Sequence, residues 1–431
     1  MKIKELAKRA KEASIYLAGA TTEDKNKALK EIIFLLDEKR REIISANQMD
    51  VDESEKNNLA YPLLKRLKFD DKKLDGVIEG IQSLMTIPDP VGETLSAKEL
   101  DNGLELYKVS CPIGLIGVIF ESRPDALVQI STLCLKSGNA VLLKGGSEAR
   151  NTNRILSDII REASIKSGMP KDWIQLLESR AEVNEMLDLD ESIDLIIPRG
   201  SNEFVKYIMD HSNIPVLGHA DGICHMYIES DAEPEMAVNL AVDSKVQYVA
   251  VCNALETLLV HEEIAPRVLP ELKKAFDKHN VELRGCEKTM NYIDIHQANE
   301  EDWKTEYLDY ILSIKVVSGL DEAISHINTN GSHHTDSIIT VDKNKAAKFM
   351  NLVDSGNVLW NCSTRFSDGY RYGLGAEVGI STNKIHARGP VGLEGLLIYK
   401  WKLKGSGQAV KPYANGDKKF THRKINKNFE V

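Results

Sequence analysis

Apolar residues recur at helical spacing through the first 90 residues of the chain. From Leu6 to Leu17 they return every three or four positions, which places them on one face of a helix. The polar run Thr21–Asp24 then carries the signal for the N-cap of a second helix. Residues 1–90 are therefore predicted to be helical.

The pair Asn102-Gly103 separates two short extended runs. Asn-Gly supplies the two positive-φ positions of a tight turn, so residues 98–112 are predicted to form a β-hairpin. A hairpin that projects from an α/β chain is often an arm for assembly with other subunits. A surface loop is the simpler alternative.

From residue 113 onward, apolar runs of strand length alternate with helical segments. Such alternation predicts an α/β fold with parallel, doubly wound sheets. The first unit is predicted to hold strands at 114–120, 140–143, 173–177 and 193–197 and helices at 124–137, 148–167, 181–189 and 202–210. A second unit follows residue 223, with strands at 224–228, 311–317, 337–341 and 357–360 and helices at 234–245, 264–279, 321–328 and 344–353.

Polar clusters fall where three of the first unit's strands end: Glu121–Pro124, Lys144–Glu148 and Pro198–Ser201. The carboxyl ends of parallel strands share one edge of a sheet, and ligands bind there. Glycines in such turns let the backbone approach a ligand, and the helix N-termini that follow favour phosphate. Together the three turns predict a nucleotide-binding crevice.

Cys252 is the residue that most suggests covalent chemistry. The apolar, β-branched run Val246–Val251 predicts a strand, and Asn253–Val260 predicts the start of a helix, which places the thiol at their joint. The N-terminus of a helix stabilises a thiolate, and a thiolate suits a nucleophile. The alternative is that Cys252 serves as a small buried apolar residue, as free cysteines commonly do.

Composition narrows the functional classes. A chain of 431 residues is long enough for two or three domains, and 42% hydrophobic with 28% charged residues is typical of a globular protein. The net charge of −10 argues against general binding to nucleic acid or membrane surfaces. The N-terminus lacks the apolar core of a signal peptide, and no apolar run is long enough to span a bilayer. The scattered cysteines indicate reduced thiols and a cytoplasmic location: Cys111, Cys134, Cys224, Cys252, Cys286 and Cys362.

Five segments carry a resemblance that covers essentially the whole chain. They are 217–224 (LGHADGIC), 251–261 (VCNALETLLVH), 326–338 (HINTNGSHHTDSI), 363–369 (STRFSDG) and 373–396, which begins GLGAEVGIST and ends HARGPVGLEGL. In this order they resemble the aldehyde dehydrogenase superfamily and, within it, the gamma-glutamyl phosphate reductases.

The resemblance implies an aldehyde dehydrogenase-like fold of two doubly wound α/β domains. Residues 1–222 would bind the cofactor, with the hairpin 98–112 inserted as an oligomerisation arm. Residues 223–388 would form the catalytic domain, and residues 389–431 a C-terminal oligomerisation segment and tail. A homo-oligomer is therefore expected.

The same resemblance assigns roles to individual residues. Cys252 matches the catalytic thiol, and NADP(H) is the expected cofactor. The cofactor-binding residues that it implies are Lys144 and Glu148 at the adenine-side ribose and phosphate, Gly200 and Ser201 near the pyrophosphate, and Glu306 at the nicotinamide ribose.

The implied reaction is the NADPH-dependent reduction of L-glutamyl 5-phosphate to L-glutamate 5-semialdehyde and phosphate, through a thioester on Cys252. This is the second step of proline biosynthesis from glutamate; glutamate kinase would supply the labile substrate, and direct hand-over between the two enzymes is left open. Arginine suits such an anionic small molecule, so Arg365 is the leading candidate, with a surface ion pair as its alternative role. The other substrate-binding candidates are Ser332, His334, Thr335, Asp336 and His219.

Departures from the superfamily pattern are equally informative. Hydrolytic members carry a Glu-Leu-Gly-Gly-Lys segment whose glutamate activates water against the thioester. Here the matching stretch is 217–222, and His219 stands where that glutamate would be. Hydrolysis to a free acid is therefore not expected. The alternative functions are an acylating, coenzyme A-dependent aldehyde dehydrogenase and a catalytically silent paralogue.

The adjacent pair His333-His334 raises the question of a metal site. Neighbouring histidines on an extended chain point to different sides and make poor co-ligands, and their spacing matches no standard zinc motif. No metal site is predicted.

Overall fold

The computed structural model describes residues 3–178, 181–375 and 377–430. The chain divides into two compact units. Unit 1 comprises Met1–Gly200, Ile208–Val216 and Gly392–Val431, and unit 2 comprises Ser201–Tyr207 and Leu217–Val391. Both units contain a parallel sheet with helices, which confirms the predicted fold class. Within the described ranges, no helix is both long and apolar enough to cross a membrane.

Unit 1 begins with five helices, as the spacing of apolar residues predicts: α1 (Ile3–Leu17), α2 (Thr22–Glu38), α3 (Arg40–Lys56), α4 (Tyr61–Leu67) and α5 (Asp71–Thr86). Helix α2 starts at the expected signal. The Thr21 hydroxyl accepts a hydrogen bond from the Asp24 amide at 3.1 Å, and the Asp24 carboxylate accepts one from the Thr21 amide at 3.2 Å. This reciprocal pair satisfies two amides at the helix start and so fixes where α2 begins.

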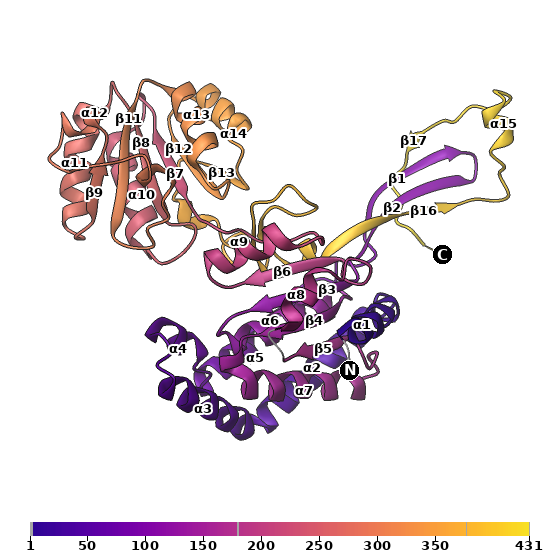
Figure 1. Ribbon diagram of the computed structural model, residues 1–431. Helices are drawn as coiled ribbons and strands as arrows, with labels where there is room; N and C mark the ends of the chain where they lie inside the picture. Colours follow the sequence, from indigo (N-terminus) through magenta and orange to yellow (C-terminus); the bar gives the residue numbers. More distant parts are fainter. Residues whose placement is uncertain (1–2, 179–180, 376, 431) are drawn as a thin grey trace. The chain divides into compact units, whose positions relative to one another are not determined.

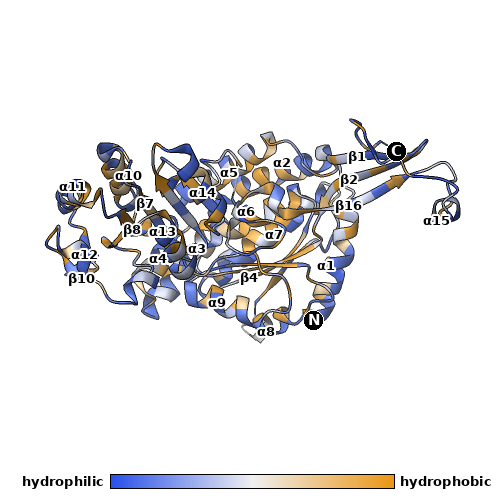
Figure 2. Cartoon of the chain, turned by 90° about the horizontal axis from the view of Figure 1, so that it is seen from above, coloured by the Kyte–Doolittle hydropathy of each residue, from blue (hydrophilic) through white to orange (hydrophobic). Residues whose placement is uncertain are grey.

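A four-stranded parallel sheet forms the centre of unit 1, in the order β5-β4-β3-β6. Its strands are β3 (Leu115–Phe120), β4 (Ala140–Gly145), β5 (Ile174–Leu177) and β6 (Leu195–Arg199); the helices that follow each in turn are α6 (Pro124–Lys136), α7 (Arg150–Lys166), α8 (Ala181–Leu187) and α9 (Asn202–His211). Strands β3 and β4 are buried throughout, and α6 is largely hydrophobic (Figure 2). Phe120 lies opposite Gly145 on one side and Arg199 on the other, so the predicted polar turns do share one edge.

The predicted hairpin is confirmed as β1 (Thr94–Asp101) and β2 (Leu104–Pro112), with Gly103 at the turn at φ 70°. Two C-terminal strands extend it, β16 (Leu397–Lys404) beside β2 and β17 (Arg423–Lys424) beside β1. Figure 1 shows this yellow C-terminal chain running along the hairpin. The resemblance predicted only an oligomerisation segment and tail over residues 389–431, without strands. The three lysines in Leu397–Lys404 obscure the alternating pattern of an edge strand.

Unit 2 is built on a seven-stranded sheet in the order β10-β9-β11-β8-β7-β12-β13, parallel throughout. The strands are β7 (Cys224–Ile228), β8 (Leu255–His261), β9 (Glu282–Gly285), β10 (His296–Gln297), β11 (Ile311–Val317), β12 (Thr335–Ile339) and β13 (Asn357–Trp360). The helices are α10 (Pro234–Val246), α11 (Ala265–Asp277), α12 (Glu287–Met290), α13 (Leu320–Asn330) and α14 (Lys343–Leu352). A two-stranded sheet follows, β14 (Gly379–Ser381) and β15 (Gly389–Val391).

Helices cover both faces of this sheet (Figure 1), and each face has its own apolar core. Residues of α10 and α11 pack into one core, and residues of α13 and α14 into the other. Strand β8 serves both, since Leu258 and Val260 enter the first core while Leu259 enters the second. This alternation is the period of a strand that is buried on both faces.

The predictions of a strand at Val246–Val251 and of a helix at Asn253–Val260 are therefore both wrong. Residues 247–254 form turns and Leu255–His261 is strand β8, so Cys252 precedes a strand and does not lie at the N-terminus of a helix. The leucine spacing in ALETLLV fits a helix face and a doubly buried strand equally well, and only the sheet pairing with β7 and β11 separates them.

The parallel arrangement gathers the loops that matter in unit 2 at one edge. Residues 217–223 precede β7, residues 247–254 precede β8, and residues 331–334 precede β12, and these three strands are neighbours in the sheet. Their loops therefore meet at the amino edge of the sheet. The polar turns of unit 1 instead lie at a carboxyl edge.

Candidate active site

Cys252 sits in a loop that packs tightly against the segment before β7. A Cβ atom on Gly222 would lie 2.1 Å from the Cys252 carbonyl oxygen, so only glycine permits this approach of the two backbones. Beneath the same carbonyl, the Cys224 thiol donates a hydrogen bond to it at 3.1 Å. Both contacts fix the backbone of Cys252 and leave its own side chain partly exposed.

Residues 363–367 clamp the Cys252 loop from the other side. The Asn253 side-chain amide donates to the Ser367 carbonyl at 2.7 Å, and the Thr364 hydroxyl donates to the Asn253 backbone carbonyl at 2.8 Å. The Arg365 guanidinium donates to the Gln247 side chain at 2.9 Å. Side-chain hydrogen bonds thus replace regular secondary structure in ordering this loop, as a buried irregular backbone requires.

Two histidines approach the thiol. The Cys252 sulfur and one ring nitrogen from each of His219 and His334 lie within 4.8 Å of one another. The two imidazoles pack edge to face with their centroids 4.9 Å apart. Nδ1 of His219 lies 2.9 Å from the Ile380 carbonyl oxygen, and Nδ1 of His334 lies 2.9 Å from the Thr335 hydroxyl. Both His219 and His334, predicted as substrate-binding residues, therefore belong to the Cys252 site.

Burial distinguishes Cys224 and Cys134 from Cys252, whose side chain is partly exposed. Cys224 is fully buried, and this desolvation raises the pKa of its thiol well above the ordinary value. Cys134 is likewise buried in unit 1, and its thiol pKa is raised for the same reason. A thiol that stays protonated is a poor nucleophile. Cys224 is instead a structural thiol, because its S–H is donated to the Cys252 carbonyl.

Arg365 is a buried arginine and not part of a surface ion pair. It is 8% exposed and, among the described residues, makes no ion pair. Burial lowers the pKa of its guanidinium, the nearby Arg371 lowers it further, and the negative charge of a Cys252 thiolate would raise it. The guanidinium therefore supplies positive charge close to the thiol.

Three other predicted substrate-binding residues hold the walls of the site together. The Ser332 hydroxyl accepts from the Ile223 amide at 2.8 Å, and the Thr335 hydroxyl donates to Ser367 at 2.9 Å. Asp336 is buried within β12, where one oxygen accepts from the His225 amide at 2.8 Å and the other accepts from the Ser355 hydroxyl. These contacts favour supporting roles for Thr335 and Asp336.

Acidic groups line a further part of the edge. Glu306 accepts a hydrogen bond from the side-chain amide of Asn202, and burial raises the pKa of its carboxyl. Behind the loop, Lys245 and Glu256 form an ion pair at 2.5 Å with both side chains fully buried. Burial raises the pKa of Glu256 to about 7 and lowers the pKa of Lys245. The sequence did not predict this pair, because no local pattern shows that Glu256 in a buried strand would meet Lys245 at the end of a helix.

Three of the predicted cofactor residues, Lys144, Glu148 and Gly200, belong to unit 1 and lie at the carboxyl edge of its sheet, and Ser201 follows directly in the chain. Lys144 ends β4 with its side chain buried and its amine donating to the Gly145 carbonyl. Glu148 accepts from both the amide and the hydroxyl of Ser122 at 2.7 Å, which ties the turn after β4 to the turn after β3. Gly200 and Ser201 follow β6 directly, and the Ser201 carbonyl accepts from the Val205 amide in the first turn of α9.

This edge fits the adenosine half of a nicotinamide cofactor. A Cβ on Gly145 would lie 2.2 Å from the Asn153 amide nitrogen, and one on Gly146 would lie 2.0 Å from a Glu148 oxygen, so the turn presents bare backbone. The Asn153 side-chain oxygen is buried without a hydrogen-bond partner in the described part of the chain. A carboxylate, an ammonium and an unpaired amide oxygen are suitable partners for ribose hydroxyls and phosphate.

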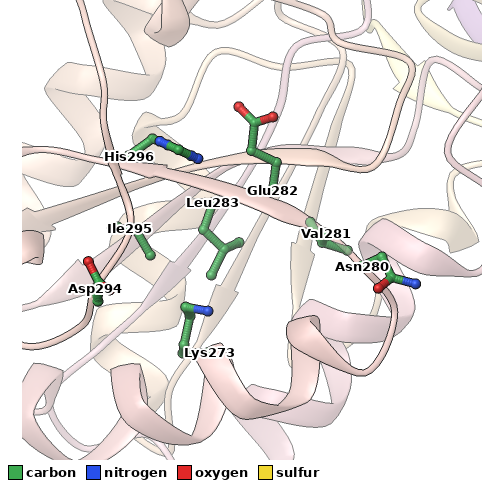
Figure 3. A pocket seen from close by; sticks show the side chains of 8 residues that line it. All are labelled: Lys273, Asn280, Val281, Glu282, Leu283, Asp294, Ile295 and His296. Carbon is green, nitrogen blue, oxygen red and sulfur yellow. The ribbon is translucent and has the colours of Figure 1, made fainter.

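A hollow lies at the β9–β10 edge of unit 2. Figure 3 shows its lining side chains, which include Lys273, Glu282 and His296. Lys273 is committed to an ion pair with Asp277, and Glu282 to one with Arg284. No predicted site residue lines this hollow.

Comparison with known proteins bears directly on this geometry. Residues 1–290 match the aldehyde dehydrogenase family. The gamma-glutamyl phosphate reductase of Acetivibrio thermocellus is 68% identical over 431 residues, which is 100% of each chain. That of Pelotomaculum thermopropionicum is 68% identical and covers 100% of this chain and 99% of the relative. The crystal structure of gamma-glutamyl phosphate reductase from Thermotoga maritima superposes with a TM-score of 0.92 at 43% identity, covering 94% of this chain and 99% of that one.

Proposed function

The chain belongs to the gamma-glutamyl phosphate reductases of the aldehyde dehydrogenase family, and we propose that it reduces L-glutamyl 5-phosphate through a thioester on Cys252. The products are L-glutamate 5-semialdehyde and phosphate. The observation that supports this most is the placement of a partly exposed thiol beside two imidazoles and a buried arginine. The acylating and catalytically silent alternatives are not favoured by relatives of this identity and coverage.

In the first step the Cys252 thiolate attacks the acyl carbon and phosphate leaves, which forms the thioester. His219 is suited to accept the thiol proton. Its Nδ1 must carry the hydrogen that bonds the Ile380 carbonyl, because a carbonyl can only accept, so Nε2 bears a lone pair. The positive charge of Arg365 stabilises the thiolate and offers a partner for an anionic group of the substrate.

Reduction of the thioester then takes a hydride, which a reduced nicotinamide supplies when it is bound. The resulting thiohemiacetal collapses to the semialdehyde and restores the Cys252 thiolate. Residues of this chain hold the Cys252 loop in one position during this step: Gly222 and Cys224 fix the Cys252 backbone, and Asn253 anchors the loop to Ser367. We place catalysis in unit 2 for this reason.

A nicotinamide cofactor follows from the family, and we propose NADP(H) with the adenosine half held by unit 1. Lys144 would contact phosphate, Glu148 the adenine-side ribose, Gly200 and Ser201 the pyrophosphate, and Glu306 the nicotinamide ribose. The buried ammonium of Lys144 supports a phosphate on the ribose. A lower KM for NADH than for NADPH would contradict this choice.

The first prediction concerns the fate of the thioester. Because His219 replaces a water-activating carboxylate, the acyl-enzyme should persist until phosphate attacks it. With semialdehyde and NADP but no phosphate, we expect at most one NADPH per chain, and added phosphate should start steady turnover. Absorbance of NADPH in stopped flow measures both phases.

Sustained NADPH formation in phosphate-free buffer, with glutamate accumulating, would show hydrolysis and contradict the assignment. His219→Glu is the informative variant, since a carboxylate there is expected to permit slow hydrolysis. His279→Glu, at an exposed histidine, is the matched control and should keep the phosphate requirement.

The second prediction concerns Arg365. Removing a charged hydrogen bond costs about 1.5–3 kcal/mol, so Arg365→Ala should raise the KM for the semialdehyde roughly 10–100-fold while the KM for NADP changes little. Steady-state kinetics with each substrate varied in turn measure this. Arg161→Ala removes a true surface ion pair, with Asp158, and should change neither constant. An unchanged semialdehyde KM in Arg365→Ala would return Arg365 to a structural role.

We further propose that the arm formed by β1, β2, β16 and β17 mediates a homo-oligomer. Strand β16 is an edge strand, and Tyr399, Trp401 and Leu403 alternate along it at 43%, 56% and 58% exposure. An unpaired edge that carries a row of exposed apolar side chains is typical of an interface.

The third prediction follows from that arm. Trp401→Lys should shift the protein towards smaller species in light scattering at micromolar concentration, because it places a charge in the apolar row. Leu352→Lys changes a similarly exposed residue at 51% on α14 and should leave the assembly unchanged. If Trp401→Lys and the unmodified protein have the same molecular mass in solution, the arm is not the interface.

None of the six cysteines, all of which lie in the described part of the chain, forms a disulfide, which supports the expected cytoplasmic location. The acyl phosphate must come from a kinase that acts on glutamate, and hand-over of this labile product stays a prediction. Capture of the intermediate by an external trap during coupled turnover would argue against direct transfer.

A further inference from the structure

Three donor atoms converge on one point at the amino edge of the unit 2 sheet. His219 comes from the loop before β7, Cys252 from the loop before β8, and His334 from the residue before β12. One nitrogen or sulfur from each lies within 4.8 Å of the other two. These three loops are far apart in the sequence, so no local spacing reveals the cluster. The neighbouring His333 takes no part, since its Nδ1 lies 2.6 Å from the Asp354 carbonyl oxygen.

Hydrogen bonds select the tautomer of both imidazoles. Nδ1 of His219 donates to the Ile380 carbonyl. Nδ1 of His334 faces the Thr335 hydroxyl, whose own hydrogen is donated to Ser367, so the ring nitrogen must be the donor. Both rings therefore carry hydrogen on Nδ1 and a lone pair on Nε2. A donated second nitrogen is the usual way that proteins orient metal-binding histidines.

His334 adds an independent sign of a missing ligand. Its side chain is fully buried, and its Nε2 has no hydrogen-bond partner among the residues that the structure describes. Burial lowers the pKa of His334 well below its ordinary value, which keeps the ring neutral. A buried unpaired nitrogen is costly to fold and calls for an explanation. A cation held between Nε2 and the Cys252 sulfur would pair it.

We propose that His219, Cys252 and His334 bind one zinc-class, thiophilic divalent cation, and that this ion inhibits the enzyme by occupying the thiolate. Binding exchanges the thiol proton for the metal and involves no oxidation. One thiolate and two neutral imidazoles are soft to borderline donors that suit Zn²⁺ and not Mg²⁺ or Ca²⁺. Three protein ligands leave a fourth position for water. Bonds of about 2.0–2.3 Å to zinc require the donors to close in by about 1 Å, which the partly exposed Cys252 side chain can supply.

The inhibitory consequence rests on the proposed role of Cys252 as nucleophile, whereas metal binding itself does not. Co²⁺ added to the full-length protein is expected to give one bound ion per chain with sulfur-to-cobalt charge-transfer absorption. Cys252→Ser should abolish that absorption. His334→Gln and His219→Gln should weaken Zn²⁺ binding, measured against a chromophoric chelator, by more than the roughly 10–100-fold caused by loss of an outer-shell partner. Cys286→Ser, at a partly exposed cysteine outside the cluster, is the matched control and should bind as before.

The unmodified protein supplies a test that does not depend on the folding of variants. Zn²⁺ should protect Cys252 from alkylation while leaving Cys286 reactive, as peptide mass mapping can measure, and a chelator should reverse both the protection and the loss of turnover. Alkylation of Cys252 at the same rate with and without Zn²⁺, or Zn²⁺ affinity unchanged in His334→Gln, would overturn the proposal. Turnover that survives Cys252→Ser would instead overturn the proposed function. The cobalt absorption of the unmodified protein would still report on the metal site in that case.

Discussion

The close contact between Gly222 and the backbone of Cys252 is the constraint on which the active site of unit 2 depends. Two loops that precede neighbouring parallel strands meet there, at a separation that excludes any side chain on residue 222. The contact also fixes the position of the Cys252 carbonyl, which accepts a hydrogen bond from the Cys224 thiol. It also carries the segment 217–223 past the thiol, so that His219 reaches it. A larger residue at 222 would separate these groups all at once.

The rest of the site surrounds that contact with buried polar groups that satisfy one another. Thr335, Ser367 and Asn253 link β12, the segment after β13 and the Cys252 loop through hydrogen bonds of 2.7–2.9 Å. The Lys245–Glu256 pair lies under the loop with no exposure, where breaking it would leave a costly unpaired charge. Such a network holds the thiol in one position while the side chain itself stays accessible. Positioning of this kind is what a nucleophile that forms and releases an acyl group needs.

Much of the fold was accessible from the sequence, because local signals and global packing agree. The capping box at Thr21, the turn at Gly103 and the alternation of strands and helices in unit 1 all act through short-range physics. The helix predicted at Asn253–Val260 failed because a strand buried on both faces loses its period of two, and its leucines then mimic a helix face. Strand β16 was missed because its stability comes from pairing with β2, which is almost 300 positions earlier in the chain.

The site was also predictable in part, here through the family resemblance. That resemblance located Cys252, His219 and His334, and the structure brings those three together. Whether Thr335 and Asp336 support the site or contact substrate depends on hydrogen bonds that only the folded chain displays. The Lys245–Glu256 pair and the tautomers of the two histidines belong to the same class of information, since each depends on partners from another loop.

If Cys252 carries the acyl group during turnover, the acyl adduct on its sulfur can be detected directly. The protein would be mixed with glutamate semialdehyde and NADP in phosphate-free buffer, quenched in acid, digested and examined by mass spectrometry. We expect a glutamyl thioester on the peptide that contains Cys252, near one per chain, which disappears when phosphate is added before the quench. An adduct on Cys224, Cys286 or Cys362, or none on any cysteine while NADPH forms, would contradict the assignment of Cys252.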